Sequence, residues 1–67
     1  MEIKLRLREL RKRAGLSQEE LGLRVGSSQS RVGQLEKGGS LPGIVTLCRL
    51  ADALGCKLSD LVQMEDD

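Results

Sequence analysis

Apolar residues recur at helical spacing in five short segments of the chain, most of them separated by glycines. In the first segment, about residues 2–13, an apolar residue returns every three or four positions, as on one face of an α-helix. The stripe consists of Ile3, Leu7, Leu10 and Ala14, and Leu5 lies off it. The pattern predicts a helix here. Gly15 is expected to end it, because glycine readily adopts the left-handed conformation of a helix C-terminus.

The second segment begins with a residue that can cap a helix. Ser17 and Glu20 have the spacing of a capping box, in which each side chain bonds to the other residue's backbone N–H group. The predicted buried face consists of Leu21 and Val25. Gly22 lies between them, where its small size lets another helix approach closely, and Gly26 is expected to break the helix.

The third segment follows a short turn that contains glycine. Ser28 is the predicted N-cap of a helix over residues 28–36, with Val32 and Leu35 pointing inward. Gly33 lies on the polar side and costs this helix roughly 1 kcal/mol relative to alanine. We infer that something must come close to the backbone there. Two short helices joined by a turn of three or four residues match the helix-turn-helix unit.

The fourth segment is expected to begin near Pro42, which tolerates the first turn of a helix because it has no N–H group to leave unpaired. Its predicted inner stripe consists of Ile44, Leu47, Leu50, Ala51 and Leu54, and Gly55 ends it. The fifth segment is short and apolar at Leu58, Leu61 and Val62. Lys57 is a poor cap, so this helix is expected to be the weakest.

Together these segments predict an all-α fold, a compact five-helix domain in which the second and third helices form the helix-turn-helix. We expect a single domain over residues 1–67. Its ordered core is predicted at about residues 2–63, followed by a frayed acidic tail at 64–67.

The composition removes several classes of function. The chain has no His and no aromatic residue, so stacking platforms for single-stranded bases are absent. Its two cysteines form no CxxC pair, and we expect neither a metal nor a cofactor. No phosphate loop or catalytic cluster stands out, so an enzyme is not predicted. Without an apolar leader or a disulfide framework, a reducing cytoplasm is the expected location.

Charge is distributed unevenly although the net charge is only +1. Residues 1–37 contain nine basic and five acidic residues, whereas residues 38–67 contain two basic and five acidic ones. The first part is therefore suited to a polyanion and the second is not. Two solvated surfaces would produce the same pattern, so charge alone does not decide the function.

The ordered set of motifs resembles the lambda-repressor-like helix-turn-helix domains of phage repressors, Cro proteins and related bacterial (XRE-type) regulators. The resemblance covers about residues 3–62. It rests on Leu7-Arg8-Glu9-Leu10-Arg11, Gly15-Leu16-Ser17-Gln18-Glu19-Glu20-Leu21, Gly26, Ser28-Gln29-Ser30, Val32, Leu35-Glu36-Lys37-Gly38, Pro42 and Leu50-Ala51-Asp52-Ala53-Leu54-Gly55. The chain departs from the family at Gly22, where alanine is usual, and at Ser27, where an apolar residue is common. The glycine is expected to be harmless to packing.

The resemblance implies that helix 28–36 enters the major groove of double-stranded DNA. An α-helix fits that groove, and its N-terminal residues reach the base edges. The predicted base-contacting residues are Gln29, Ser30, Gln34 and Gly33. Glutamine is a good reader because its carboxamide can donate and accept together and so match the edge of adenine.

A second set of residues is predicted to contact phosphates, which position the protein without reading sequence. It comprises Gln18, Ser28, Arg31, Lys37, Gly39 and Ser40. In the family, Gln18 also braces the first base-reading glutamine, here Gln29. Other basic residues of the first segment, Arg6, Arg8, Lys12 and Arg13, are expected to be solvated partners of Glu2 and Glu9 instead.

Two further expectations concern structure. The resemblance places Arg11 opposite Glu36 as an ion pair that joins the first helix to the end of the third. Cys56 occupies a position where the family often has valine, so it is expected to act as a small core hydrophobe. A redox role for Cys48 or Cys56 is a weaker alternative.

The sequence thus predicts a sequence-specific DNA-binding transcriptional regulator, most often a repressor in this family. One recognition helix reads few base pairs, so a homodimer on a palindromic operator is expected, with half-sites about 34 Å apart. The predicted dimer interface comprises Leu58, Leu61, Val62 and Met64. The alternative is a protein-interaction module, such as an antitoxin, that keeps the fold while DNA binding is secondary or absent; a toxin or an antirepressor would then be its partner.

Overall fold

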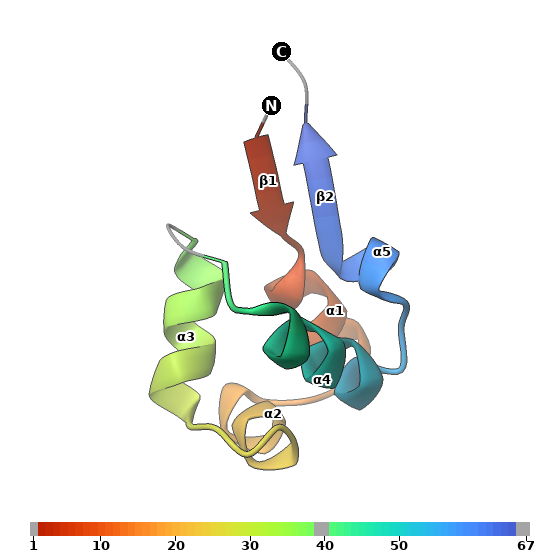
Figure 1. Cartoon of the computed structure of the whole chain (residues 1–67). Helices are drawn as coiled ribbons and strands as arrows, with labels where there is room; N and C mark the ends of the chain where they lie inside the picture. Colours follow the sequence, from red (N-terminus) through yellow and green to blue (C-terminus); the bar gives the residue numbers. More distant parts are fainter. Residues whose placement is uncertain (1, 39–40, 66–67) are drawn as a thin grey trace.

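Five helices and a two-stranded sheet form the part of the chain that the computed structural model describes, residues 2–38 and 41–65 (Figure 1). The helices are α1 (Leu7–Arg13), α2 (Gln18–Arg24), α3 (Gln29–Lys37), α4 (Ile44–Leu54) and α5 (Leu58–Leu61). The strands are β1 (Glu2–Leu5) and β2 (Val62–Glu65). The five predicted helices are confirmed, and the sheet is an addition to them.

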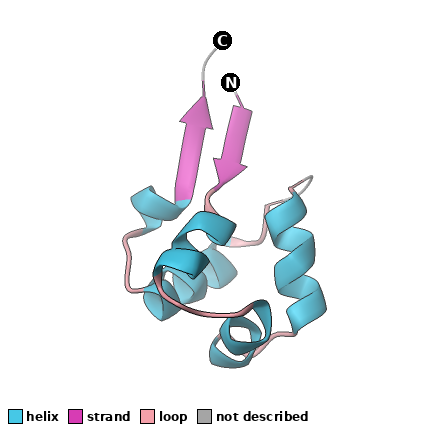
Figure 2. Ribbon diagram, turned by 180° about the vertical axis from the view of Figure 1, so that it is seen from behind, coloured by secondary structure: helices cyan, strands magenta, loops and turns pink. Residues whose placement is uncertain are grey.

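The sheet corrects both ends of the sequence-based prediction. Residues 2–5 are not helical, because they pair antiparallel with β2 in a register that places Ile3 opposite Met64 and Leu5 opposite Val62. Val62 therefore leaves α5 and begins a strand. Met64 and Glu65, expected to fray, are hydrogen-bonded into the sheet, whereas residues 66–67 lie outside the described part. Figure 2 shows the two strands extending together from one end of the helical body.

The core is built from the predicted apolar faces. Its fully buried members are Leu7, Leu21, Val32, Leu50 and Leu61. Three members of the predicted stripes do not join it: Ala14 is exposed, Ile3 is 41% exposed and Ile44 is 61% exposed. Ile44 is exposed because α4 begins there, so that its first turn lies outside the core. Pro42 precedes the N-cap residue Gly43 instead of occupying that first turn.

Capping and turns follow the sequence closely. The Ser17 hydroxyl accepts a hydrogen bond from the Glu20 N–H group, and the Ser17 N–H group donates to the Glu20 carboxylate, both at 3.0 Å. The Ser28 hydroxyl caps α3 by accepting from the Arg31 N–H group at 3.2 Å. Gly26 turns the chain between α2 and α3 with φ of +69°, a conformation that side chains disfavour. The turn at Gly26 and the cap at Ser28 together determine the direction in which α3 begins.

Gly22 determines how closely the start of α3 approaches α2. A Cβ atom added at Gly22 would lie 2.8 Å from the carbonyl carbon of Ser28, too close for the backbone as it stands. The Ser27 N–H group also donates to the Gly22 carbonyl at 2.7 Å. Glycine at this position therefore suits the packing, whereas the Cβ atom of the usual alanine would not fit the backbone as it stands.

Among the described residues, none of the helices combines the length and the hydropathy that crossing a membrane requires.

Candidate nucleic-acid interface

The outward side of α3 is polar and open to solvent. Val32 and Leu35 fix the opposite side of this helix in the core, at 0% and 3% exposure. All but one of the predicted base-contacting residues are exposed: Gln29, Ser30 and Gln34 lie at the surface, and Gly33 is half-buried. The structure therefore brings the four residues together on one accessible helix face.

This face forms one wall of a concave surface of about 690 Å³ between α1, α2 and α3. We call this concavity the α3 groove. Its lining residues are Arg8, Arg11, Gln18, Gln29, Ser30, Gly33, Gln34, Glu36 and Lys37. Amides, guanidinium groups and an ammonium group dominate this set, so the surface offers hydrogen bonds and positive charge to a ligand.

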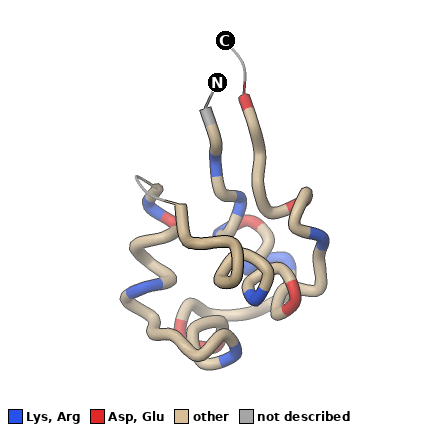
Figure 3. The backbone as a smooth tube through the Cα atoms, in the orientation of Figure 1, with Lys and Arg blue, Asp and Glu red and all other residues tan. Residues whose placement is uncertain are grey.

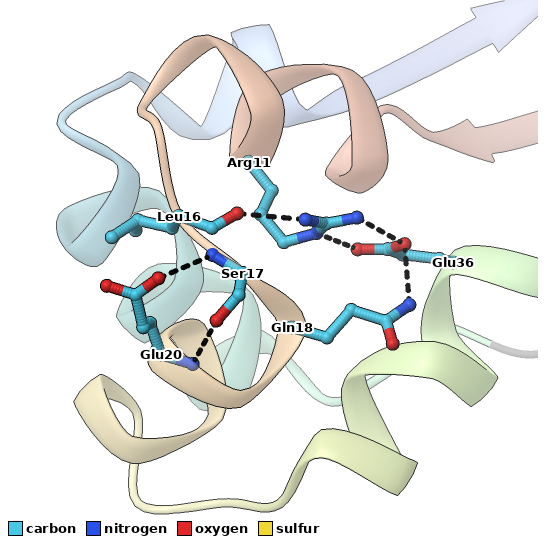
Figure 4. Close-up of polar contacts among 6 residues, drawn as sticks. All are labelled: Arg11, Leu16, Ser17, Gln18, Glu20 and Glu36. Carbon is cyan, nitrogen blue, oxygen red and sulfur yellow. Dashed lines mark hydrogen bonds and ion pairs between the residues drawn. The ribbon is translucent and has the colours of Figure 1, made fainter.

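An ion pair holds the back of the groove together (Figure 4). Arg11 Nε donates to Glu36 Oε2 at 2.6 Å, and Arg11 Nη2 donates to Glu36 Oε1 at 3.3 Å. Arg11 Nη1 donates to the Leu16 carbonyl at 2.8 Å, and Gln18 Nε2 donates to Glu36 Oε1 at 3.1 Å. Arg11 and Glu36, expected to face each other, thus link α1, the turn before α2, and the end of α3.

The environment of this pair favours the charged form of both partners. Burial raises the pKa of Glu36, but hydrogen bonds from Arg11 and Gln18 and the positive charges of Arg11 and Arg8 outweigh burial, so the net pKa lies below its ordinary value of 4.5. The hydrogen bond to Glu36 raises the pKa of Arg11. Among the described residues, no buried side-chain nitrogen or oxygen lacks a hydrogen-bond partner. The pair is therefore a satisfied, fixed support.

Gln18 lies beside Gly33 and Gln29 in the groove, but its carboxamide is bonded to Glu36. Within the described part of the chain, no hydrogen bond joins Gln18 to Gln29, so the expected bracing of Gln29 stays a prediction. A Cβ atom at Gly33 would come 3.7 Å from the Gln18 carboxamide, which is ordinary contact distance. The protein itself thus leaves room for a side chain at Gly33.

The predicted phosphate-contacting residues are spread around α3. Lys37 lines the groove, and Ser28 is exposed at the N-terminus of α3. Arg31 lies on the side toward α4, where it lines a separate recess together with Ser27 and Arg49. Gly39 and Ser40 lie outside the described residues. The basic residues of α3 are Arg31 and Lys37, and Figure 3 shows in blue how basic positions are distributed over the backbone.

Arg8 is the groove residue that sequence reasoning assigned elsewhere. It was expected to be a solvated partner of a glutamate, but Glu9 pairs with Arg6 at 2.7 Å and with Arg13 at 3.3 Å. Arg8 instead lines the α3 groove with Gln29 and Gln34. The spacing of Arg8 and Arg11 could have indicated this position, because residues three apart share a helix face. Since Arg11 faces Glu36 on α3, Arg8 lies on the side of α1 that faces α3.

The residues of the predicted dimer patch have unequal exposure. Leu61 is fully buried in the core of its own chain, and Leu58 and Val62 pack against that core. Met64 is 66% exposed. Of the cysteines, Cys48 is exposed, whereas Cys56 packs against the core, where burial and the charge of Asp60 raise its thiol pKa.

Comparison with known proteins agrees with this architecture. The sequence model of the helix-turn-helix family matches residues 7–61, which include all five helices. The chain belongs to the helix-turn-helix family. Within it, the chain is of the lambda-repressor-like type.

The relatives include transcription factors of similar size. An uncharacterized HTH-type transcriptional regulator of Bacillus subtilis, YgzD, is 34% identical over 65 residues, which cover 97% of this chain and 98% of that protein. The restriction-modification controller protein C.AhdI from Aeromonas hydrophila superposes with a TM-score of 0.77 and 42% identity, covering 82% and 80% of the two chains. The P22 c2 repressor, solved in complex with a synthetic operator, superposes with a TM-score of 0.74 and 33% sequence identity. The match covers 81% of this chain and 82% of that chain.

Proposed function

We propose that this helix-turn-helix chain binds double-stranded DNA sequence-specifically, as a homodimeric transcriptional repressor with α3 in the major groove of each half of a palindromic operator. One observation supports this most strongly: the polar face of α3 is exposed while its other face is fixed in the core and its end is anchored by Arg11 and Glu36. A rigid, open helix is what readout of base edges requires.

We assign roles to the groove residues from their chemistry. Gln29 and Gln34 present carboxamides, which match the donor and acceptor of adenine in the major groove. Ser30 reads less selectively, and Gly33 lets the backbone approach the bases. Arg8 and Lys37 border the readers and would neutralise phosphates on either side. The P22 c2 repressor, a solved relative in complex with a synthetic operator, supports operator binding by analogy.

The test is selection from a random duplex library followed by affinity measurements over a range of salt concentrations. We expect the bound pool to converge on a two-half-site sequence. Affinity should fall with salt at a slope of about −0.9 per neutralised phosphate on a logarithmic scale. A pool that stays random, with no salt-sensitive binding, would contradict the proposal and favour the protein-interaction alternative.

A further inference from the structure

A small recess lies on the side of α3 that the α3 groove does not use. It is formed by the turn between α2 and α3, by α3 itself and by α4, and we call it the α4 recess. The groove and the recess share no lining residue, although α3 contributes to both. The volume of the recess is about 160 Å³. A phosphate group fits into this space, because one water occupies only about 30 Å³ in the liquid.

The polar groups of the α4 recess are all suited to an anion. Two guanidinium groups, those of Arg31 and Arg49, and two hydroxyl groups, those of Ser27 and Thr46, line it, whereas no carboxylate of the described residues does. The other lining residues are a glycine and apolar members of the core. Guanidinium donors match the oxygens of a phosphate, and the apolar floor strengthens the attraction by lowering the local dielectric constant.

Neither arginine of the recess is engaged within the protein. Three other arginines pair with glutamates, but in the described part of the chain no ion pair or side-chain hydrogen bond is formed by Arg31 or Arg49. Asp52 follows Arg49 by three positions and borders a neighbouring depression, yet no ion pair joins the two. Two like charges in one small recess repel each other, so a bound anion would stabilise their arrangement.

The position of the recess beside α3 indicates which anion it would meet. The major groove of DNA is about 12 Å wide, and an α-helix with its side chains is about 10–12 Å across, so a helix in the groove lies against both phosphate backbones. Arg8 borders α3 on the side of α1. Arg31 and Arg49 border it on the side of α4. Presenting Gln29 to the bases would therefore bring the two sides of α3 to different DNA strands.

We propose that the α4 recess binds one backbone phosphate of the DNA strand opposite the strand that Arg8 contacts, and that Arg31 and Arg49 hold this phosphate together. The site rests on the proposed function, because it requires α3 to lie in the major groove. Arg49 is a positioning residue that the sequence patterns did not single out. Since Arg31 belongs to α3 and Arg49 to α4, one phosphate would link the two helices and fix the tilt of α3 against the bases.

The first experiment removes the two arginines separately and together and measures affinity for the selected operator over a range of salt concentrations. The variants are Arg31→Gln, Arg49→Gln and the double variant, and thermal unfolding verifies that each stays folded. The control is Lys57→Gln, which removes an exposed positive charge outside both the groove and the recess.

The expected result follows from two arginines sharing one phosphate. The double variant should lose roughly tenfold in affinity, and its salt slope should fall by about one instead of two. Its loss should also be smaller than the product of the two single losses, because the two side chains act on the same group. Arg49→Lys keeps the charge and should recover most of the salt slope, and the control should change affinity by less than about twofold.

A second experiment locates the phosphate on the DNA. Single uncharged methylphosphonates are placed along both strands of the operator, and the affinity of each duplex is measured. The native chain should lose affinity at positions on both strands. The Arg31→Gln/Arg49→Gln variant should become insensitive at one position, and Arg8→Ala should become insensitive at a position on the other strand.

Several results would overturn the strand contact and leave the proposed function standing. These are an unchanged salt slope in the double variant, a change no larger than that of Lys57→Gln, and insensitivity of the double variant and Arg8→Ala at the same phosphate. Inorganic phosphate is also titrated into the chain without DNA. Saturable binding that the double variant loses, with unchanged operator binding, would assign the recess to a free anion instead. A native chain without salt-sensitive binding to any duplex would contradict the proposed function and the strand contact together.

Discussion

Arg11 Nε lies 2.6 Å from Glu36 Oε2, and this ion pair joins α1 to the last turn of α3. The side chains of Arg11 and Glu36 are only 11% and 6% exposed. If one partner were removed, water could therefore solvate the remaining charge only poorly. The two residues lie 25 positions apart in the chain. The pair therefore couples the stability of the fold to the placement of the helix that faces DNA.

Removing one partner should be costly. Glu36→Ala leaves Arg11 charged, buried and short of two hydrogen bonds, and we expect a loss of about 3 kcal/mol in the free energy of unfolding. Urea denaturation measures this. Glu9→Ala is the control, because it breaks ion pairs at the surface, where losses stay below about 1 kcal/mol. Similar losses in the two variants would show that the buried pair has no special role.

The lowered pKa of Glu36 predicts a pH dependence. A carboxyl group whose pKa is lower in the folded state stabilises the fold fully above its unfolded-state pKa, here about 4.5, and loses that contribution as pH falls through the folded-state pKa. The difference in unfolding free energy between the native chain and Glu36→Gln should thus be constant above about pH 5.5 and shrink below about pH 4.5. The pKa values of Glu9 and Glu20 are also lowered, but both titrate in each protein and cancel in the difference. A gap that does not depend on pH would contradict the assignment.

Gln29 should affect specificity more than general affinity. Gln29→Ala removes a carboxamide at the start of α3, and we expect a loss of roughly 1–3 kcal/mol on the selected operator and a much smaller loss on random duplex. Fluorescence anisotropy on the two duplexes measures both. Gln63→Ala serves as the control, because it removes an exposed carboxamide from β2, outside the groove. Equal losses on both duplexes would remove Gln29 from base reading.

Arg8 should behave in the opposite way. As a phosphate contact it carries no sequence information, so Arg8→Ala should weaken binding to operator and random duplex alike and reduce the salt slope by about one. Arg13→Ala removes the same charge from the same helix, but Arg13 pairs with Glu9 and does not line the groove. An unchanged salt slope in Arg8→Ala, or the same reduction in both variants, would refute the contact.

Gly33 offers a test in which stability and binding change in opposite directions. Gly33→Ala should raise helix stability by up to about 1 kcal/mol, because the new methyl group meets only the Gln18 carboxamide at ordinary distance. The same methyl group would project into the groove and should weaken operator binding. Thermal unfolding and anisotropy together measure the two effects. Tighter binding would mean that nothing approaches the Gly33 backbone.

Gly22→Ala provides the contrast to Gly33→Ala, because it places a methyl group against the Ser28 backbone. Overpacking of this kind costs about 1–3 kcal/mol, more than the gain in helix propensity. We therefore expect Gly22→Ala to destabilise the fold. If the two alanine variants were equally stabilising, the close approach of α3 to α2 would not constrain Gly22.

Local signals in the sequence were sufficient for the helical part of the fold. The capping box at Ser17, the cap at Ser28 and the glycine turns act within a few residues, so they are readable without tertiary contacts. The stripes around Leu21, Val32 and Leu50 identify the core for the same reason, since each repeats at the helical period. Within the site, the polar face of α3 is the complement of its buried face and could be predicted with it.

Contacts between distant residues were beyond the reach of these local signals. Ile3 and Leu7 fit a helical stripe, but pairing of β1 with β2, some 60 residues away, made residues 2–5 a strand. Arg8 could be placed on a helix face, yet only the packing of α1 beside α3 put it in the groove. The sequence by itself determined the presence of five helices, the caps at Ser17 and Ser28 and the exposed polar face of α3. Tertiary structure decided the sheet, the place of Arg8 and the burial of Leu61, because each depends on which surfaces meet after the chain has folded.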